Sequence, residues 1–169
     1  MTAVPEFSRL VPLASLGRDP FVQAIEADAE ERAALARRFG LISLDRLAAQ
    51  VTLRRLPRDG VLLEARFEAE FAQECVVTLE PVAGSVADGF SLRYGPPDSE
   101  AEDDPASEQP AFEPLPDAAV DIGEAVAQEF SLALPLSPRL PEADAALAEV
   151  TPAEPADNPF AVLRRLAEE

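Results

Sequence analysis

The sequence predicts an α+β protein, in which an antiparallel sheet of four to six strands, open or barrel-like, packs against two or three helices and carries a long acidic loop. Three observations favour this class. Apolar residues recur at every second position through much of residues 47–94, as they do in half-buried strands. Two acid-x-x-Glu sequences each precede apolar residues at helical spacing. Proline and acidic residues dominate residues 96–118, a composition typical of loops.

Length and composition favour a single domain, residues 1–169, without catalytic chemistry. A chain of this size buries roughly 70% of its unfolded surface, which is enough for a core without disulfides. The sequence has no His, Lys or Trp, which excludes phosphate-binding loops ending in Lys, kinase-type lysines and Schiff-base enzymes. Two carboxylates such as Glu64 and Glu68 would lie roughly 13 Å apart on a strand, too far for a catalytic pair. We expect no enzyme, no cofactor and no small-molecule substrate.

The only cysteine, Cys75, lies in the apolar stretch QECVVTLEPV. A cysteine nucleophile normally needs a neighbouring His, and a structural zinc site needs about four Cys or His ligands. The composition offers neither. We therefore interpret Cys75 as a small buried hydrophobe, with a redox-sensing thiol as the alternative.

The first helix is predicted at residues 29–39. Before it, three prolines among residues 1–20 favour an extended edge strand or arm. Asp28 and Glu31 have the spacing of a capping box, and apolar residues follow four apart on one face. Gly40 stands where a residue in the left-handed conformation ends a helix.

An antiparallel hairpin is predicted after this helix. Residues 47–54 and 61–71 both alternate between apolar and polar side chains, and the turn sequence Pro-Arg-Asp-Gly at 57–60 separates them. Arginines on the outer face of such a hairpin are expected to pair with cross-strand carboxylates rather than to contact RNA. For a turn centred near Asp59, the predicted outer-face pairs are Arg54 with Glu64 and Thr52 with Arg66.

Two further strands complete the predicted sheet. Residues 75–79 are predicted as a strand that Pro81 stops, because proline cannot donate to a ladder. Another strand is predicted from Gly84 to the Gly-Pro-Pro sequence at 95–97. Four or five antiparallel strands result.

Residues 96–118 are predicted as an acidic, proline-rich loop. They hold six prolines and no basic residue, so they cannot bury enough apolar surface to offset the entropy of ordering. The carboxylates of this loop lack the glycine and the spacing of a calcium loop, so no metal site is predicted there. These carboxylates are Asp98, Glu100, Glu102, Asp103 and Asp104.

The remaining chain is predicted to contain one long and one short helix. Asp121 and Glu124 repeat the capping spacing, and a helix of about 12 residues that ends before Pro135 should pack its apolar stripe on the open sheet face. Residues 135–157 form a Pro/Ala-rich linker. A short helix over 158–167 then either docks on its own core, which we favour, or is held for a partner. Its start combines an N-cap Asn158, Pro159 in the first helical position and the apolar Phe160.

The negative charge is concentrated in the second half of the chain. Residues 1–93 hold 14 acids and 11 Arg, a net charge of −3, whereas residues 94–169 hold 18 acids and 3 Arg, a net charge of −15. Such a field repels phosphate backbones and attracts basic surfaces. A basic protein partner is therefore expected, although acidic runs are also common as solvated faces that keep a protein soluble.

The sequence indicates a soluble, cytoplasmic protein without a membrane partner. Its start, MTAVPEFSRL, has no basic region followed by an apolar one, and a single Cys cannot form an internal disulfide. No apolar run approaches the roughly 18 residues that a membrane span requires.

Four blocks of the sequence resemble the YceD family, which is associated with accumulation of large-subunit ribosomal RNA. They are CVVTLEPV at 75–82, FSLRYGP at 90–96, DIGEAVAQEFSLALPLSPR at 121–139 and NPFAVLRRL at 158–166. The commoner family pattern is Cys-x-Arg-Cys followed by Leu-Glu. Here Val77 stands at the Arg position and Thr78 at the second Cys position, so a metal-like role proposed for the family's Cys cluster is not available. The motif positions, whose roles the resemblance does not give, are Cys75, Thr78, Leu79, Glu80, Pro81, Asp121, Glu124, Pro135, Asn158, Pro159 and Phe160.

The resemblance implies a bacterial, non-enzymatic factor in ribosome biogenesis and large-subunit ribosomal RNA accumulation. Because the chain is acidic, we expect it to act through a basic ribosomal or rRNA-processing protein. Local RNA contact through the arginines of residues 1–93 stays an alternative. An acidic protein-interaction adaptor unrelated to ribosomes is the other candidate.

Overall fold

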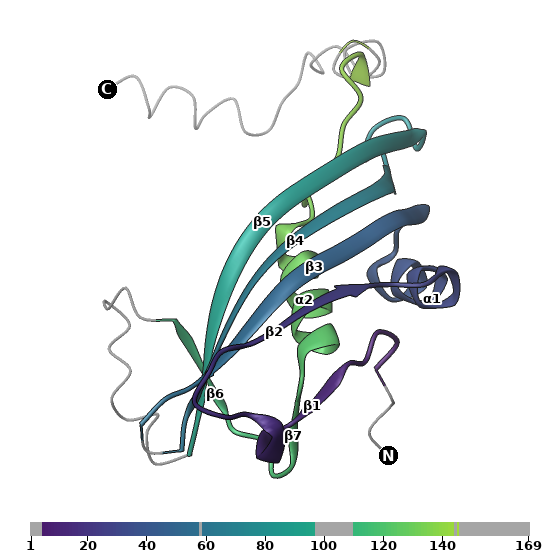
Figure 1. The fold of residues 1–169 in the computed structure, drawn as a ribbon. Coiled ribbons are helices and arrows are strands. Elements are labelled where there is room, and N and C mark those ends of the chain that lie inside the picture. The colour runs from purple at the N-terminus through teal and green to yellow at the C-terminus, as the bar shows by residue number, and fades with distance from the viewer. Residues whose placement is uncertain (1–4, 58, 97–109, 144, 146–169) are drawn as a thin grey trace, which may run out of the picture.

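A computed structural model describes residues 5–57, 59–96, 110–143 and 145 of the chain (Figure 1). Its helices are α1 (Ala29–Phe39), α2 (Ile122–Ala133) and the single 3-10 turn η1 (Leu13–Ser15). Its strands are β1 (Leu10–Pro12), β2 (Phe21–Glu26), β3 (Ser43–Arg55), β4 (Val61–Glu74), β5 (Pro81–Gly95), β6 (Ala111–Pro114) and β7 (Ala119–Asp121).

Five strands form one open sheet in the order β2-β3-β4-β5-β6, and β1 pairs separately with β7. All neighbours are antiparallel except β5 and β6, which run parallel. This arrangement, with two packed α-helices, confirms the predicted α+β class. In the part of the chain that the structure describes, β2 and β6 are edges, so the sheet does not close into a barrel.

Helix α1 forms where the sequence predicts it. The Asp28 carboxylate accepts hydrogen bonds from the N–H groups of Glu30 and Glu31, and the Glu31 side chain accepts one from the Asp28 N–H. This is the complete capping box that the spacing indicates. Gly40 ends the helix with a φ of 66°, a conformation that costs little energy only for glycine.

The predicted hairpin is confirmed as β3 and β4, but its register is two residues away from the predicted one. Residues 56–60 join the strands, and the innermost pair is Arg55 with Val61. The hairpin is therefore centred one residue before Asp59, which shifts every pair by two. The predicted pairs are wrong, since Arg54 lies opposite Leu62, Thr52 opposite Glu64 and Gln50 opposite Arg66.

The prediction of a strand at residues 75–79 is wrong. These residues form the turn between β4 and β5, in which Leu79 has a φ of 63°. β5 begins at Pro81 and runs as one strand to Gly95, instead of starting at Gly84. Proline fits the first position of a strand as well as its end, because the missing N–H interrupts no ladder there.

Three short strands, β2, β6 and β7, were not expected from the sequence. β2 pairs with β3 over its whole length, and β6 pairs in parallel with the end of β5. β6 lies within the predicted loop 96–118, of which residues 97–109 are outside the described part. The predicted N-terminal arm does contain an extended segment, β1, but it pairs with β7 instead of the main sheet.

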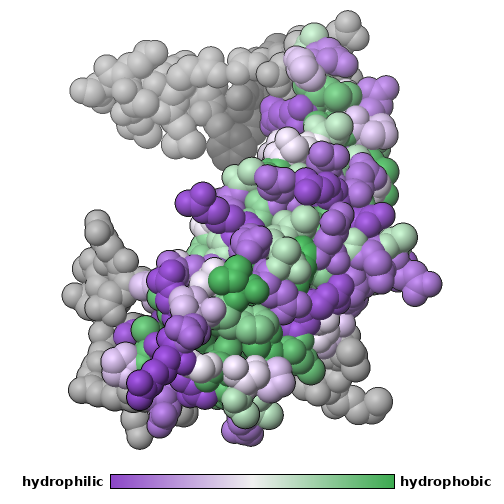
Figure 2. All heavy atoms as spheres, viewed as in Figure 1, coloured by the Kyte–Doolittle hydropathy of each residue, from purple (hydrophilic) through white to green (hydrophobic). Residues whose placement is uncertain are grey.

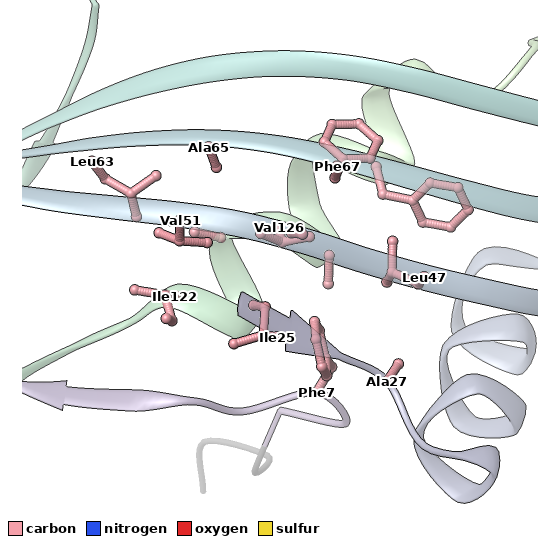
Figure 3. Close-up of a cluster of buried hydrophobic side chains, with 14 of the residues drawn as sticks. Phe7, Ile25, Ala27, Leu47, Val51, Leu63, Ala65, Phe67, Ile122 and Val126 are labelled. Carbon is pink, nitrogen blue, oxygen red and sulfur yellow. The ribbon is translucent and has the colours of Figure 1, made fainter. Parts of the chain in front are cut away.

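Helix α2 lies against β1, β4 and β5 and covers the core (Figure 1). Ile122, Val126 and Phe130 are fully buried, as the predicted apolar stripe requires. The Phe130 ring packs edge-on against Phe71, with centroids 5.7 Å apart. Figure 3 shows Ile122 and Val126 in one cluster with side chains of β2, β3 and β4. No helix of the described residues is long and apolar enough to span a membrane.

Candidate functional site

The motif positions of residues 75–81 form one compact turn. The N–H of Cys75 donates to the carbonyl of Glu80 at 2.8 Å, and the N–H of Leu79 donates to the carbonyl of Cys75 at 3.0 Å. The N–H of Thr78 donates to the Cys75 Sγ at 3.4 Å. These bonds wrap the backbone around the sulfur atom, and Pro81 follows as the first residue of β5.

Residues that follow α2 cover this turn. The N–H of Val76 donates to the carbonyl of Pro138 at 3.0 Å, and Ala143 is fully buried. Cys75 also has no exposed surface, so its predicted burial is confirmed. Neither Cys75 nor Ala143 belongs to the main core cluster, so the thiol lies in a thin separate layer.

The surroundings of Cys75 favour its thiolate. Hydrogen bonds from the side chain and N–H of Thr78, with smaller contributions from the N–H groups of Leu140 and Val77, lower the pKa of Cys75 to about 7. Burial opposes this shift but is outweighed, because the covering layer is thin. The sequence predicted a small buried hydrophobe, with a redox-sensing thiol as the alternative. It did not indicate these donors, because the conformation of the turn decides whether the Thr78 side chain and the N–H groups face the sulfur.

A threonine replaces the second cysteine of the commoner family pattern in this turn. Thr78 donates hydrogen bonds to the Cys75 sulfur. Within the described ranges, no three His, Cys, Asp or Glu side chains gather in a way that could hold a metal ion.

Asp121 and Glu124 lie at the other end of α2 and have structural contacts. The Asp121 carboxylate accepts hydrogen bonds from the Ser8 hydroxyl at 2.5 Å and the Arg9 N–H at 2.7 Å, and it also caps α2. Glu124 does not complete a capping box. Its carboxylate instead accepts two hydrogen bonds from Arg38 of α1, at 2.7 and 2.9 Å, which lowers its pKa.

The structure therefore separates the motif positions into two groups. Pro135 links the two groups. It follows α2, which begins after Asp121, and its carbonyl accepts a hydrogen bond at 3.2 Å from the side chain of Gln73, two residues before Cys75. The sequence did not show this division, because it depends on where α2 crosses the sheet. The predicted helix over 158–167, with Asn158, Pro159 and Phe160, lies outside the described residues, as does most of the predicted linker.

The outer face of the sheet has a shallow hollow of about 950 Å³ with a mixed rim. Small side chains of β2, β3 and β5, among them Ala24, Ala48 and Ala87, contribute to its lining. On its rim, Arg46 forms an ion pair with Glu68 at 2.8 Å. Figure 2 likewise shows hydrophilic residues spread over the visible part of the sheet with hydrophobic ones between them. The hollow thus offers no concentrated positive charge.

Many arginines of residues 1–93 are engaged within the protein. Arg54 forms an ion pair with Glu64 at 3.2 Å, despite the shifted register, which agrees with the expected cross-strand role. Arg55 donates to two backbone carbonyls of the segment before β2. Such contacts leave these guanidinium groups fewer donors for phosphates. The arginines with internal acceptors include Arg9, Arg32, Arg38, Arg46, Arg54 and Arg55.

The comparisons with known proteins gave one match. Neither the curated proteins nor the solved structures contain a match to this chain. One family model matches residues 63–167, from β4 through α2 and beyond the described part. Because this match covers more than half of the sequence, the chain belongs to the family described as Large ribosomal RNA subunit accumulation protein YceD.

Proposed function

We propose that this protein is a non-enzymatic, cytoplasmic factor in ribosome biogenesis that supports large-subunit ribosomal RNA accumulation by binding a basic ribosomal or rRNA-processing protein. Membership of the YceD family supports the ribosomal part of this proposal. The charge of −18 supports a basic partner, because a field of this sign attracts cationic surfaces and repels RNA.

The engaged arginines are the observation that favours a protein partner over direct RNA binding. A surface that binds RNA needs arginines or lysines free to contact phosphates. Here Arg38 contacts Glu6 and Glu124, and Arg46 contacts Glu68. Moving these side chains to phosphates would leave their carboxylates unpaired beside the RNA.

Sedimentation at low salt tests the ribosomal role. The protein should migrate with precursor large-subunit particles and leave them when the salt concentration rises. A protein that stays in the soluble fraction under all conditions would instead support an acidic adaptor unrelated to ribosomes.

Binding to purified ribosomal RNA tests the choice of partner. We expect negligible capture of free RNA, both by the unmodified protein and after replacement of Arg54, Arg55 and Arg58 by Gln. Tight binding that these replacements abolish would contradict the protein-partner proposal and would make the first 93 residues an RNA-binding surface.

A further inference from the structure

Among the described residues, one side of β5 has no partner strand over most of its length. β4 pairs with β5 from Pro81 to Tyr94, but β6 pairs with its other side only from Leu92 to Gly95. Within the described residues, no strand and no other backbone hydrogen bond engages residues 81–91 on that side. Free N–H and C=O groups along a strand are a template for a further strand. We call residues 82–91 the β5 edge.

The β5 edge lacks the usual protection against pairing. Natural edge strands are commonly blocked by charged side chains, prolines or bulges. Between residues 82 and 91 the only charged side chain is Asp88, and there is no proline. The pairing of β5 with β4 is also regular, with no register shift along it.

Apolar side chains line the β5 edge on the face that α2 covers. The register places Val86 opposite Ala69 and Phe90 opposite Ala65, both of which are buried. Val86 and Phe90 are only half-buried, and the Phe90 ring lies 6.3 Å from that of Phe67. An added strand would therefore cover further apolar surface of these residues.

Three carboxylates gather beside this apolar surface. Asp88 lies between Val86 and Phe90 on the same face of β5, and Glu113 lies opposite Tyr94 in β6. Glu129 of α2 completes the group, because burial and the negative charges of Glu113 and Asp88 raise its pKa. In the described part of the chain, none of the three carboxylates forms an ion pair.

Tyr94 adds a polar group to the same face. It is only 6% exposed, and its side chain forms no hydrogen bond with the described residues. Its pKa is raised by burial and then by Glu113, Asp121 and Glu129, which places it beside the carboxylates. By contrast, the half-buried Glu31 and Glu124 each have an arginine partner. Asp88 of the β5 edge and the neighbouring Glu113 and Glu129 thus have no cationic partner within the described part of the chain.

We propose that the β5 edge binds an extended, basic segment of a partner protein by strand addition. The segment pairs its backbone with residues 82–91, places apolar side chains against Val82, Val86 and Phe90, and places Arg or Lys among Asp88, Glu113 and Glu129. Because side chains on one face of a strand are two residues apart, a suitable segment carries its cation two residues from an apolar residue on either side. This assignment rests on the proposed function for the class of partner.

The probe is a ten-residue peptide in which every second residue is Thr and the positions between them alternate Val and Arg, so that Val and Arg lie on the same face. Its binding to the full chain is measured by fluorescence anisotropy. A second peptide has the same sequence but N-methyl groups on alternate backbone nitrogens, which keeps the charge and removes donors. Strand addition predicts at least about tenfold weaker binding of the methylated peptide. Equal binding of both peptides would overturn the proposal, because attraction of charges alone would then explain the affinity.

Charge variants test whether the β5 edge is the surface involved. Asp88→Asn with Glu129→Gln should weaken binding of the unmethylated peptide about tenfold or more. The matched control, Glu70→Gln with Glu74→Gln, removes the same charge from exposed positions of β4 and should change affinity less than about twofold. Equal losses in both variants would overturn the proposal. A thermal melt of each variant verifies folding.

Other occupants of the β5 edge give distinct results. If residues 98–109 of the same chain occupied it, the peptide would bind only after these residues were replaced by Gly and Ser. If a second copy occupied it, the chain would dimerise and Val86→Lys would abolish the dimer. Either result would overturn the proposal.

Two outcomes distinguish the failure of this proposal from the failure of the proposed function. If the double variant Asp88→Asn, Glu129→Gln no longer bound the peptide but still sedimented with precursor particles, only the proposal for the β5 edge would fail. If the unmodified protein bound the peptide but never sedimented with particles, the ribosomal function would fail alone.

Discussion

Cys75 combines complete coverage with hydrogen-bond donors that stabilise its thiolate. Its pKa falls from 9.0 to about 7 in the folded chain, so the folded state releases the thiol proton more readily than the unfolded state. By linkage, this group adds stability as the pH rises from about 7 towards 9 and adds none below about 7. The Thr78 side chain is the largest cause of this lowered pKa.

We predict that the difference in melting temperature between the native protein and Cys75→Ser is larger at pH 9 than at pH 6. A serine hydroxyl does not ionise in this range, so only the native protein gains from the higher pH. Thr78→Val should reduce the same pH dependence, because it removes the leading donor. A Cys75 pKa near 8.5 in a direct thiolate titration would contradict this prediction.

Gly123 is required by close approach of two backbones. A Cβ at this position would meet the carbonyl oxygen and carbon of Phe7 and the N atom of Arg9, the last at 3.0 Å. We predict that Gly123→Ala destabilises the protein by about 1–3 kcal/mol. The added Cβ would clash with backbone atoms, which cannot relieve the clash by changing rotamer as a side chain can. Gly17→Ala is the control, since a Cβ there meets nothing within 4 Å. Chemical denaturation measures both, and equal effects would show that the contact is not tight.

At the scale of elements, predictions from the sequence succeeded where the signal was local. The Asp28 cap and Gly40 are neighbours in the chain, and they define α1 without help from the rest of the fold. Alternation over many residues likewise identified β3 and β4. The register was missed because residue types do not fix the centre of a five-residue connection, and one residue of error there shifts each pair by two.

Elements that depend on distant partners were missed or misread. β6 has four residues and exists because the end of β5 pairs with it. Residues 75–79 are apolar enough for a strand, but hydrogen bonds within the turn hold Leu79 at a positive φ that its side chain does not favour. For the candidate interaction surface, the sign of the charge could be predicted from the composition. It could not bring together Asp88, Glu113 and Glu129, which come from three elements.

The contact between α1 and α2 can be measured by a double-mutant cycle. Arg38 and Glu124 have side chains 32% and 19% exposed, and two hydrogen bonds join them. We predict a coupling energy of about 0.5–1 kcal/mol for Arg38→Ala with Glu124→Ala. The control pair, Arg46 with Glu68, is 43% and 65% exposed and should couple less strongly. Equal coupling in the two pairs would mean that burial does not strengthen the first.

For the whole molecule, the net charge of −18 governs how a basic partner approaches. Screening shortens the reach of this field from about 10 Å at 0.1 M salt to about 3 Å at 1 M. We predict that salt mainly slows association with precursor particles. Replacement of the acids in the predicted loop by Asn or Gln should do the same and leave dissociation nearly unchanged. Interferometry on immobilised protein measures both rates, and an effect confined to dissociation would contradict the prediction. The acids are Asp98, Glu100, Glu102, Asp103 and Asp104, all outside the described residues.

The pairing of β1 with β7 also has a consequence for the order of folding. Ser8 and Asp121, which hold the N-terminal segment to α2, are 113 residues apart in sequence. At roughly 5–20 residues per second, a ribosome needs about 5–20 s to synthesise the chain between them. The strands β2 to β5 leave the ribosome before α2 is synthesised. They can therefore pair while Phe7, which is buried in the finished protein, is not yet covered by α2. Because Ser8 and Arg9 are bonded to Asp121 at the start of α2, we expect the N-terminal segment and α2 of the finished protein to open together, as one cooperative unit, before the hairpins of the sheet do.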